Sequence, residues 1–318
     1  MAPRSSAATS SSPVSRTTKR APLRPLRANP VAKRAPAPAP LLPSAAPVIK
    51  WVGGKSKLLP ELTSRMPVSF NRYYEPFAGG LAMYFRVVSH TGAARSVIND
   101  GNPDLVALYR VIAVDVEALI RRLAIHRNLH NEEHYYSVRA RWNDASVSWS
   151  AVDRAAAFIY LNKTCFNGLW RVNKSGHFNV PMGRYDEPPI CVPDALRSAA
   201  AALHGAELRC GDFRAAVRDA RDGDFVYFDP PYDPVATTAN FTSYTQSGFT
   251  PDDQRELAEL ARTLVARGCN VMLSNSDTPF IRSLYKGFAI DTVKCARAIN
   301  SNASKRGAVD EVVIFNRR

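Results

Sequence analysis

Short apolar runs rich in β-branched and aromatic residues alternate with amphipathic stretches along the chain from about Val48 onward. Runs of this kind predict β-strands, and the stretches between them predict helices. The alternation is typical of an α/β protein with a largely parallel, doubly wound sheet. The predicted strands are Tyr73–Phe77, Ser96–Asn99, Glu207–Cys210, Phe225–Asp229, Asn270–Ser274, Ile290–Cys295 and Glu311–Phe315.

Helix caps support this pattern. Asn102-Pro103, Ser150-x-x-Asp153 and Thr250-Pro251-Asp252-Asp253 each place a capping side chain before a helix, and Gly268 ends the last of the three. Between about Leu105 and Pro193 the alternation fails, and Asn, Gly, Arg and aromatic residues become frequent. The predicted parts of the chain are a tail (1–47), the first part of the sheet domain (48–104), an inserted helical subdomain (105–193) and the rest of the sheet domain (194–318).

The tail has an unusual composition. Residues 1–47 are mainly Ala, Ser, Arg and Pro, a mixture that buries too little apolar surface to fold, so we expect disorder. Eight Lys and Arg residues and no acid lie there, so the formal charge of +14 leaves +6 for the remainder. Such a basic excess is typical of proteins with a polyanionic partner. Three interpretations stay open for the tail: a tether to nucleic acid, an organelle-targeting peptide, and an inert extension or misplaced start codon.

Composition also restricts the cellular compartments in which the protein is expected. No stretch of about 18 apolar residues occurs, which excludes a transmembrane helix and a membrane partner. The cysteines are odd in number and far apart, which disfavours a disulfide framework or a thiolate zinc site. No apolar segment follows the basic N-terminus, so no secretory signal is predicted. We expect a cytoplasmic, nucleoid-associated protein, with organelle targeting by the tail as the alternative.

A glycine turn follows the first predicted strand. In Tyr74-Glu75-Pro76-Phe77-Ala78-Gly79-Gly80 the paired glycines let the backbone turn tightly at the carboxyl edge of a sheet, where ligands approach. The second predicted strand ends in Asn99-Asp100, and an acid at about this distance from the glycines accepts hydrogen bonds from both hydroxyls of a ribose. Together these features indicate a nucleoside-bearing cofactor and leave the nucleoside open.

The most specific motif is Asp229-Pro230-Pro231-Tyr232, directly after the apolar run Phe225-Val226-Tyr227-Phe228. Two prolines fix the loop, and a carboxylate, a backbone carbonyl and an aromatic ring converge there. An ordinary surface loop seldom combines these groups at the exit of a buried strand. The motif therefore predicts a binding or catalytic corner at the edge of the sheet.

With these motifs in this order, the chain resembles the Dam-type DNA adenine methyltransferases, the D12 class of the alpha arrangement. In that family the recognition domain lies between the glycine motif and the DPPY motif, and the resemblance runs over nearly the whole chain from Val48. The matching segments are Lys50-Trp51-Val52-Gly53-Gly54-Lys55, Glu75-Pro76-Phe77-Ala78-Gly79, Phe166-Asn167-Gly168-Leu169, Phe178-Asn179-Val180-Pro181-Met182-Gly183-Arg184-Tyr185, Asp229 to Tyr232, Thr238-Ala239-Asn240-Phe241-Thr242 and Val309-Asp310-Glu311.

The resemblance implies a Rossmann-like class I methyltransferase fold, S-adenosyl-L-methionine as cofactor, double-stranded DNA as partner, and no metal. It assigns to the cofactor site Trp51, Lys55, Phe77, Gly79, Asp100, Asp212 and Asp229. Asp212 is expected to face the adenine. Leu81 stands where some members continue the glycine run, so it is not counted as a ligand. The catalytic residues that it implies are Asp229, Pro230, Pro231 and Tyr232.

The resemblance also implies a DNA-binding surface that reads GATC. Lys50 and Arg171 suit guanine edges, and Leu169 and Pro181 suit thymine methyl groups. Arg184 is expected to contact phosphate, and the small polar and basic loop at 297–306 is expected to bind the DNA backbone. The full set is Lys50, Asn167, Leu169, Arg171, Pro181, Arg184, Tyr185, Asn302, Lys305 and Arg306, while Phe166 stands where tyrosine is common.

These residues suggest a mechanism. The adenine amine is a poor nucleophile because its lone pair is delocalised into the ring. The Asp229 carboxylate and the Pro230 carbonyl can each accept one amine hydrogen, which localises the lone pair, while Tyr232 stacks on the base. A sulfonium is already a good leaving group, so neither a metal nor a covalent nucleophile is required. The adenine must leave the duplex, because its amine lies inside the stack.

Two weaker motifs are set aside. Gly53-Gly54-Lys55-Ser56 resembles the end of a phosphate-binding loop, but Ile49 stands where that motif needs a glycine. His130-x-x-Glu133-His134, with His126 one turn earlier, matches an inverted zinc-protease pattern. A zinc site needs a further ligand and an open position, and this charged stretch is ordinary for a solvated helix.

Two alternative functions stay open. An enzyme of the same fold could act on cytosine amine, RNA or protein glutamine, although such relatives more often carry Ser or Asn in place of Asp229. A catalytically idle DNA-binding protein would keep the basic tail and the inserted subdomain, but the intact Asp229 and Tyr232 argue against it. We expect a monomer. The sequence does not distinguish a restriction-modification role from one in DNA replication and repair.

Overall fold

The computed structural model describes residues 45–92, 95–234, 248–296 and 308–316, all of which belong to one unit, Ala39–Arg318. The strands are β1 (Tyr73–Glu75), β2 (Ser96–Asp100), β3 (Glu207–Cys210), β4 (Phe225–Phe228), β5 (Asn270–Ser276), β6 (Ala289–Ala296) and β7 (Ala308–Phe315). The helices are α1 (Leu59–Ser64), α2 (Ala82–Thr91), α3 (Pro103–Val114), α4 (Val116–Asn128), α5 (Glu132–Asn143), α6 (Ala151–Thr164), the 3-10 turn η1 (Phe166–Gly168), α7 (Pro193–Leu203), α8 (Phe213–Ala216), α9 (Pro251–Ala266) and α10 (Pro279–Leu284).

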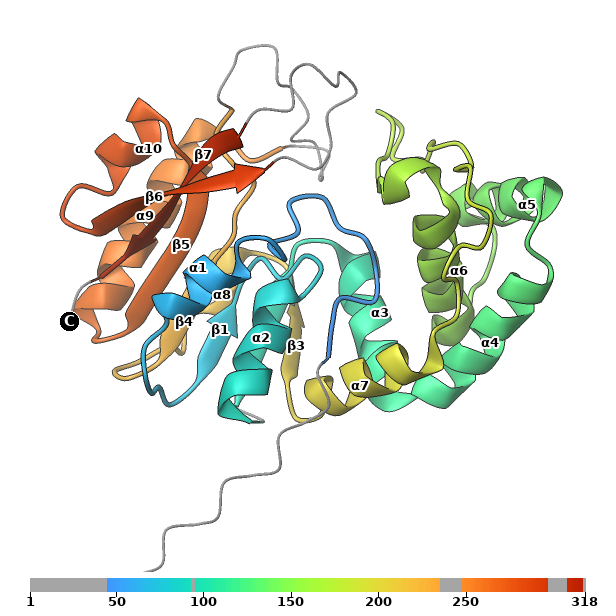
Figure 1. The fold of residues 1–318 in the computed structure, drawn as a ribbon, viewed down its shortest axis with the longest axis horizontal. Helices are drawn as coiled ribbons and strands as arrows, with labels where there is room; N and C mark the ends of the chain where they lie inside the picture. The colour runs from blue at the N-terminus through green and yellow to red at the C-terminus, as the bar shows by residue number, and fades with distance from the viewer. Residues whose placement is uncertain (1–44, 93–94, 235–247, 297–307, 317–318) are drawn as a thin grey trace, which may run out of the picture. The chain divides into compact units, whose positions relative to one another are not determined.

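All seven predicted strands form, and they belong to one sheet of order β3-β2-β1-β4-β5-β7-β6 (Figure 1). Strands β1 to β5 pair in parallel, whereas β7 runs antiparallel to both β5 and β6. The predicted Rossmann-like α/β class with a doubly wound, mostly parallel sheet is confirmed.

Each face of the sheet carries its own apolar layer because successive side chains of a strand point to opposite faces. Tyr73 and Phe225 pack with the buried faces of α1, α2 and α3. Tyr74 and Val226 pack with α8, α9 and α10 on the other face. Every residue of β4 is buried, as a central strand covered on both sides requires.

The predicted helix caps are present. Asn102 accepts hydrogen bonds from two backbone N–H groups at the start of α3, and Ser150 does so once at the start of α6. Thr250 and Asp253 form a reciprocal capping box at the start of α9. These caps fix where the helices begin, and α9 is the helix whose first turn borders the Asp229 loop.

The segment between β2 and β3 is helical, as predicted. Helices α3, α4 and α5 pack against α6, whose residues from Ala155 to Asn162 are all buried. Helix α3 also contacts β2 and β3, so the helices join the same apolar core as the first face of the sheet. The boundaries at 104/105 and 193/194 stay a prediction.

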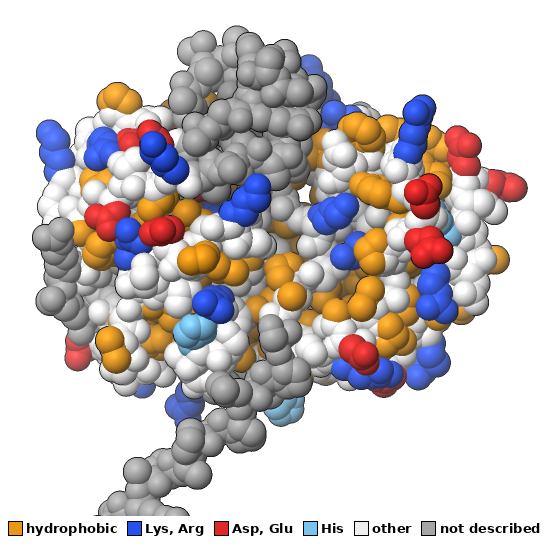
Figure 2. Space-filling model, viewed as in Figure 1, with side chains coloured by type: hydrophobic (Ala, Val, Ile, Leu, Met, Phe, Trp, Pro, Cys, Tyr) orange, Lys and Arg blue, Asp and Glu red, His pale blue; other side chains and the backbone are white. Residues whose placement is uncertain are grey.

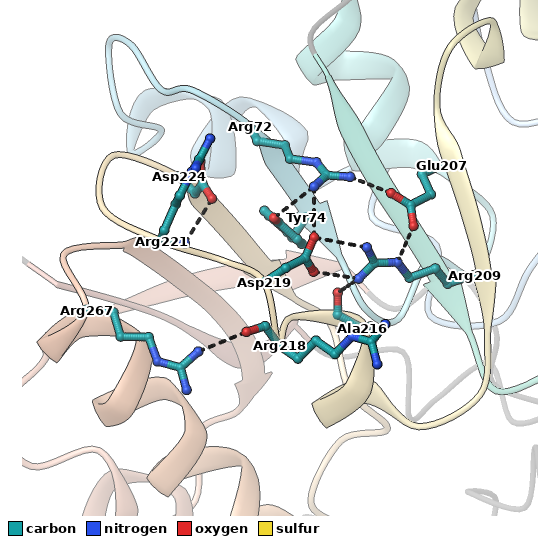
Figure 3. A network of polar contacts seen from close by, with 10 residues as sticks. All are labelled: Arg72, Tyr74, Glu207, Arg209, Ala216, Arg218, Asp219, Arg221, Asp224 and Arg267. Atoms are coloured by element: carbon teal, nitrogen blue, oxygen red, sulfur yellow. Dashed lines mark hydrogen bonds and ion pairs between the residues drawn. The ribbon is translucent and has the colours of Figure 1, made fainter.

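An ion-pair network closes the sheet at the amino ends of β1 and β3 (Figure 3). Arg72 pairs with Glu207 at 2.5 Å and with Asp219 at 2.9 Å. Arg209 pairs with the same two acids at 2.7 and 2.8 Å. Because parallel strands start at one edge and end at the other, this network stabilises the edge opposite the carboxyl ends.

No helix within the described ranges is long and apolar enough to cross a bilayer.

Candidate active site

The carboxyl ends of β1 and β4 meet at the point where strand order reverses. These strands are neighbours although β2 and β3 lie between them in the chain. The register pairs Tyr73 with Phe225 and Tyr74 with Val226, so both strands leave the sheet at the same edge. Ligand crevices form at such reversals in open α/β sheets. The Gly79 turn and the Asp229 corner, predicted from separate motifs, are therefore brought together.

Asp229 lies at the centre of this corner. Lys55 Nζ is 2.8 Å from Asp229 Oδ1, although it approaches outside the direction of a good hydrogen bond. Burial, with a smaller contribution from the charge of Glu311, raises the pKa of Asp229 to about 6 against the lowering effect of Lys55. Above pH 6 the group is therefore mainly a carboxylate, which is a hydrogen-bond acceptor.

Tyr232 is held on two sides. Its hydroxyl donates a hydrogen bond of 2.9 Å to Glu311 Oε2 on β7. Lys55 Nζ lies 4.5 Å from the centre of its ring. Burial, with the nearby Asp229 and Glu311 charges, raises the pKa of the phenol well above its usual value, so the hydroxyl stays protonated. The ring is thus fixed beside the Asp229–Lys55 pair.

Two buried amide side chains hold the loop at Pro231 and Asp233. Gln254 Nε2 on α9 donates a hydrogen bond of 2.9 Å to the Pro231 carbonyl. Asn275 on β5 donates to Gln254 Oε1 at 3.1 Å and accepts from the backbone N–H of Asp233 at 3.0 Å. Among the described residues nothing donates to the carbonyl of Pro230. The acceptor predicted for the amine is therefore the one that the network leaves open.

The Gly79 turn has the geometry that glycine allows. Gly79 has a φ of +47°, and a Cβ there would lie 2.9 Å from Trp51 Cδ1. Its N–H donates to Asp100 Oδ2 at 2.9 Å, and the N–H of Asn102 donates to Asp100 Oδ1 at 2.9 Å. Each oxygen keeps further lone pairs for a ligand. Burial raises the pKa of Asp100.

Two other predicted cofactor residues border the turn. The ring of Phe77 packs on that of Phe213, with centroids 5.2 Å apart. Asp212 caps α8 and forms an ion pair with Arg214 at 2.6 Å, so its carboxylate is engaged by its own helix. Asp212 is exposed. It lies beside the end of β2, because the N–H of the preceding residue, Gly211, donates to the Asp100 carbonyl. Its predicted contact with adenine stays a prediction.

The predicted target-reading residues gather around the end of α6. The N–H of Phe166 donates to the Pro181 carbonyl at 2.9 Å, which places Asn167 beside the segment that holds Pro181 and Arg184. Lys50 Nζ lies 4.8 Å from the ring centre of Tyr185. The exposed members of the set are Lys50, Asn167, Arg171, Pro181 and Arg184, and Leu169 and Tyr185 are partly exposed.

The remaining predicted contacts fall outside the described residues. Asn302, Lys305 and Arg306 belong to 297–307, and the matching segment Thr238 to Thr242 belongs to 235–247. On the face drawn in Figure 2, acidic side chains lie toward the two sides, whereas Lys and Arg side chains lie both there and near the middle.

The histidine motif forms a packed cluster. His126 Nδ1 lies 3.0 Å from His134 Nε2, and His130 Nδ1 lies 3.0 Å from the Tyr160 hydroxyl. Burial lowers the pKa of His126 to about 4. Within the described part of the chain no group of three or more His, Cys, Asp or Glu residues is arranged to hold a metal ion.

Four residues that the sequence did not single out support the site. They are Asn162, Gln254, Asn275 and Glu311. Glu311 lies in a segment noted for its resemblance, but its bond to Tyr232 joins β7 to the DPPY corner across the sheet, and no local pattern indicates such a contact. The buried amides have no motif at all, and a buried polar residue in an apolar stretch is the only signal they give.

A nucleoside-type glycine turn with an acid on the neighbouring strand, beside an acidic, proline-fixed corner, defines an α/β methyltransferase that acts on an amino group. The sequence model of the family described as "D12 class N6 adenine-specific DNA methyltransferase" matches residues 51–299. The chain belongs to this family.

Three relatives agree with this assignment over most of their length. The chain is 40% identical to the type II methyltransferase M1.LlaDCHI of Lactococcus lactis subsp. cremoris, over 85% of this chain and 95% of that protein. It is 40% identical to the type II methyltransferase M.MjaIII of Methanocaldococcus jannaschii, over 85% and 98%. It is 36% identical to a DNA adenine methylase of Vibrio cholerae, over 83% and 94%.

Proposed function

We propose that this enzyme transfers the methyl group of S-adenosyl-L-methionine to the N6 amine of a flipped-out adenine in GATC. The observation that carries the proposal is the Asp229 corner. A half-buried carboxylate, paired with Lys55, stands beside a proline carbonyl to which no described residue donates and a tyrosine ring whose hydroxyl is bound by Glu311. Two acceptors and a stacking surface are what an aromatic amine needs to become nucleophilic.

The residues of the Asp229 corner promote the transfer mainly by positioning the adenine amine. Asp229 and the Pro230 carbonyl each accept one amine hydrogen, which turns the nitrogen lone pair out of the ring system. Tyr232 stacks on the base and offsets part of the few kcal/mol, roughly, that flipping costs. Lys55 holds the carboxylate in place while leaving its lone pairs to the amine. The proton released after transfer passes to Asp229 or to water.

The residues around the Gly79 turn suit S-adenosyl-L-methionine. Asp100 has unused lone pairs for the ribose hydroxyls. Lys55 is a buried cation beside Asp229, and we propose that it also pairs with the carboxylate of the cofactor. Trp51 lies against Gly79, where any larger residue would meet its ring. The bound cofactor supplies an electrophilic methyl group, and these residues orient it toward the Asp229 corner. Phe77 and Asp212 complete the proposed site.

We propose GATC as the target because the positions that read it in similar proteins are occupied by suitable residues here. Lys50 and Arg171 donate to guanine edges, and Leu169 and Pro181 contact thymine methyl groups. Asn167 lies at the exposed tip of η1, with a φ of +56°. Arg184 and Tyr185 contact the DNA backbone, and we propose the same for Asn302, Lys305 and Arg306. The enzyme acts as a monomer in the compartment that holds the DNA.

Plasmid DNA free of adenine methylation tests the proposal. After exposure to the enzyme and cofactor, a nuclease blocked by N6-methylated GATC should fail to cut, while one indifferent to methylation should cut fully. If every GATC site remained open to the blocked nuclease, the target assignment would be wrong. Transfer of label to cytosine or to RNA would favour the alternative substrates.

A further inference from the structure

One buried side chain links the target-reading residues to the loop of residues 50–55, which contains the proposed cofactor ligands Trp51 and Lys55 and is called the cofactor loop below. Asn162 lies on α6 and is fully buried. Its Oδ1 accepts a hydrogen bond of 2.8 Å from the N–H of Lys50, and its Nδ2 donates one of 2.7 Å to the Lys50 carbonyl. The same Nδ2 lies 3.4 Å from the Gly168 carbonyl. One amide therefore satisfies both backbone groups of Lys50 and also reaches the turn that carries Asn167.

The next residue of the loop is held one turn earlier on the same helix. The rings of Trp51 and Phe158 are stacked with centroids 6.2 Å apart. Phe158 and Asn162 are four residues apart, so they share a face of α6. Trp51 lies against Gly79 on its other side. Two successive residues of the loop thus dock on two successive turns of α6.

The segment so held runs directly into the catalytic corner. Lys55 follows Lys50 by five residues, and its Nζ pairs with Asp229 and also donates to the Gly53 carbonyl at 2.7 Å. The N–H of Gly54 donates to the Trp51 carbonyl at 3.1 Å, which makes the intervening turn compact. A shift of Lys50 would therefore displace Trp51 and Lys55 together.

We infer that Asn162 is a positioning residue through which helix α6 sets both target discrimination at Lys50 and cofactor binding at Trp51 and Lys55. This inference rests on the proposed function, because that function places these residues in the cofactor and target sites. Asn162 touches neither ligand. It acts by fixing the backbone from which the ligand-binding side chains project.

The chain offers a matched control. Asn143 on α5 binds both backbone groups of Phe178 in the same way. Its Nδ2 donates to the Phe178 carbonyl at 2.9 Å, and its Oδ1 accepts from the Phe178 N–H at 2.8 Å. Phe178 does not belong to the cofactor loop. Removing either amide costs the fold a comparable set of hydrogen bonds, but only one removal loosens residues 50–55.

The experiment compares Asn162→Ala and Asn143→Ala in the full chain. Isothermal titration measures S-adenosyl-L-methionine binding without DNA, and competition between GATC and one-base variants measures discrimination. We expect Asn162→Ala to weaken cofactor binding about tenfold, as loss of one or two buried hydrogen bonds would, and to lower discrimination. Asn143→Ala should leave cofactor affinity within about twofold. Equal effects of the two variants on cofactor affinity, or an unchanged cofactor affinity in Asn162→Ala, would overturn the inference.

A second variant covers the case in which Asn162→Ala does not fold. Asn162→Asp keeps the shape and the acceptor for the Lys50 N–H, but it places a carboxylate oxygen against the Lys50 carbonyl. We expect weaker cofactor binding here too, and wild-type affinity in this folded variant would contradict the inference. If the wild-type enzyme bound no S-adenosyl-L-methionine, the proposed function would fail instead, so the two failures are distinguishable.

Discussion

The ionisation of Asp229 should control the acid limb of the pH–rate profile. Burial raises the pKa of this carboxyl to about 6, and protonation turns one of its two acceptor oxygens into a hydroxyl donor and removes the negative charge that draws the amine hydrogen. With a pKa of about 6, roughly 9% of the enzyme is ionised at pH 5 and roughly 91% at pH 7. We therefore expect kcat/KM to fall about tenfold between these two values.

Two substitutions should move this limb in opposite directions. The charge of Lys55 lowers the pKa of Asp229, so Lys55→Met should move the limb to higher pH. The charge of Glu311 raises that pKa, so Glu311→Gln should move it to lower pH while keeping an acceptor for the Tyr232 hydroxyl. The pair separates an electrostatic effect on Asp229 from a general loss of activity.

The assay is transfer of labelled methyl to a GATC duplex at constant ionic strength, with saturating cofactor for Lys55→Met because Lys55 also belongs to the proposed cofactor site. Circular dichroism at pH 5 controls for unfolding. A rate independent of pH down to 5 would refute this reasoning, as would a shift of both variants in the same direction.

The same pKa shift has a consequence for stability. The folded state holds the Asp229 proton more tightly than the unfolded state, whose value is near 3.8, so ionisation destabilises the fold as pH rises from about 4 to about 6. Two pKa units correspond to about 3 kcal/mol. The free energy of unfolding of Asp229→Asn, relative to wild type, should rise by up to this amount over that interval in denaturant titrations, and a constant difference would contradict the raised pKa of Asp229.

Three further outcomes are expected. Asp229→Ala should abolish methyl transfer yet leave DNA binding within a few fold, and retained activity in a filter assay would remove this carboxylate from the mechanism. Gln254→Leu should lower kcat by about tenfold with little change in DNA affinity, because the Pro231 carbonyl loses its only described donor. An unchanged kcat would mean that this hydrogen bond does not position the Asp229 loop. Deleting residues 1–47 should weaken nonspecific DNA binding and flatten its salt dependence without changing sequence preference, and an unaltered salt slope would mean that the tail is not a tether.

Local sequence patterns predicted the elements of this fold well. All seven strands were predicted, and the signal was clearest for β4, because a buried parallel strand must be apolar on both faces. It was weakest for β3, whose residues Glu207–Cys210 are exposed or half-buried at the edge of the sheet. The caps at Asn102, Ser150 and Thr250 also formed, because a cap depends only on residues within one helical turn. The placement of β7 between β5 and β6 was not predicted, since strand order depends on contacts between distant segments.

In the candidate site, too, the features set by local motifs were predicted and those set by contacts between distant segments were not. The Gly79 turn and the Asp229 corner were predicted from motifs, and a parallel sheet brings their strand ends to one edge. Asn162 and Gln254 were missed because each acts through hydrogen bonds to residues far away in the chain. Asp212 illustrates a competing local role, because the same carboxylate that follows β3 also caps α8.

Base-resolved mapping of methylated positions in DNA exposed to the purified enzyme tests the central claim most directly, because it reports the reaction, the atom and the sequence together. With S-adenosyl-L-methionine present, N6-methyladenine should appear at the adenine of GATC on both strands and should be absent with Asp229→Ala. Methyl groups on cytosine, methyladenine in unrelated sequences, or unmodified DNA in the presence of bound cofactor would contradict it.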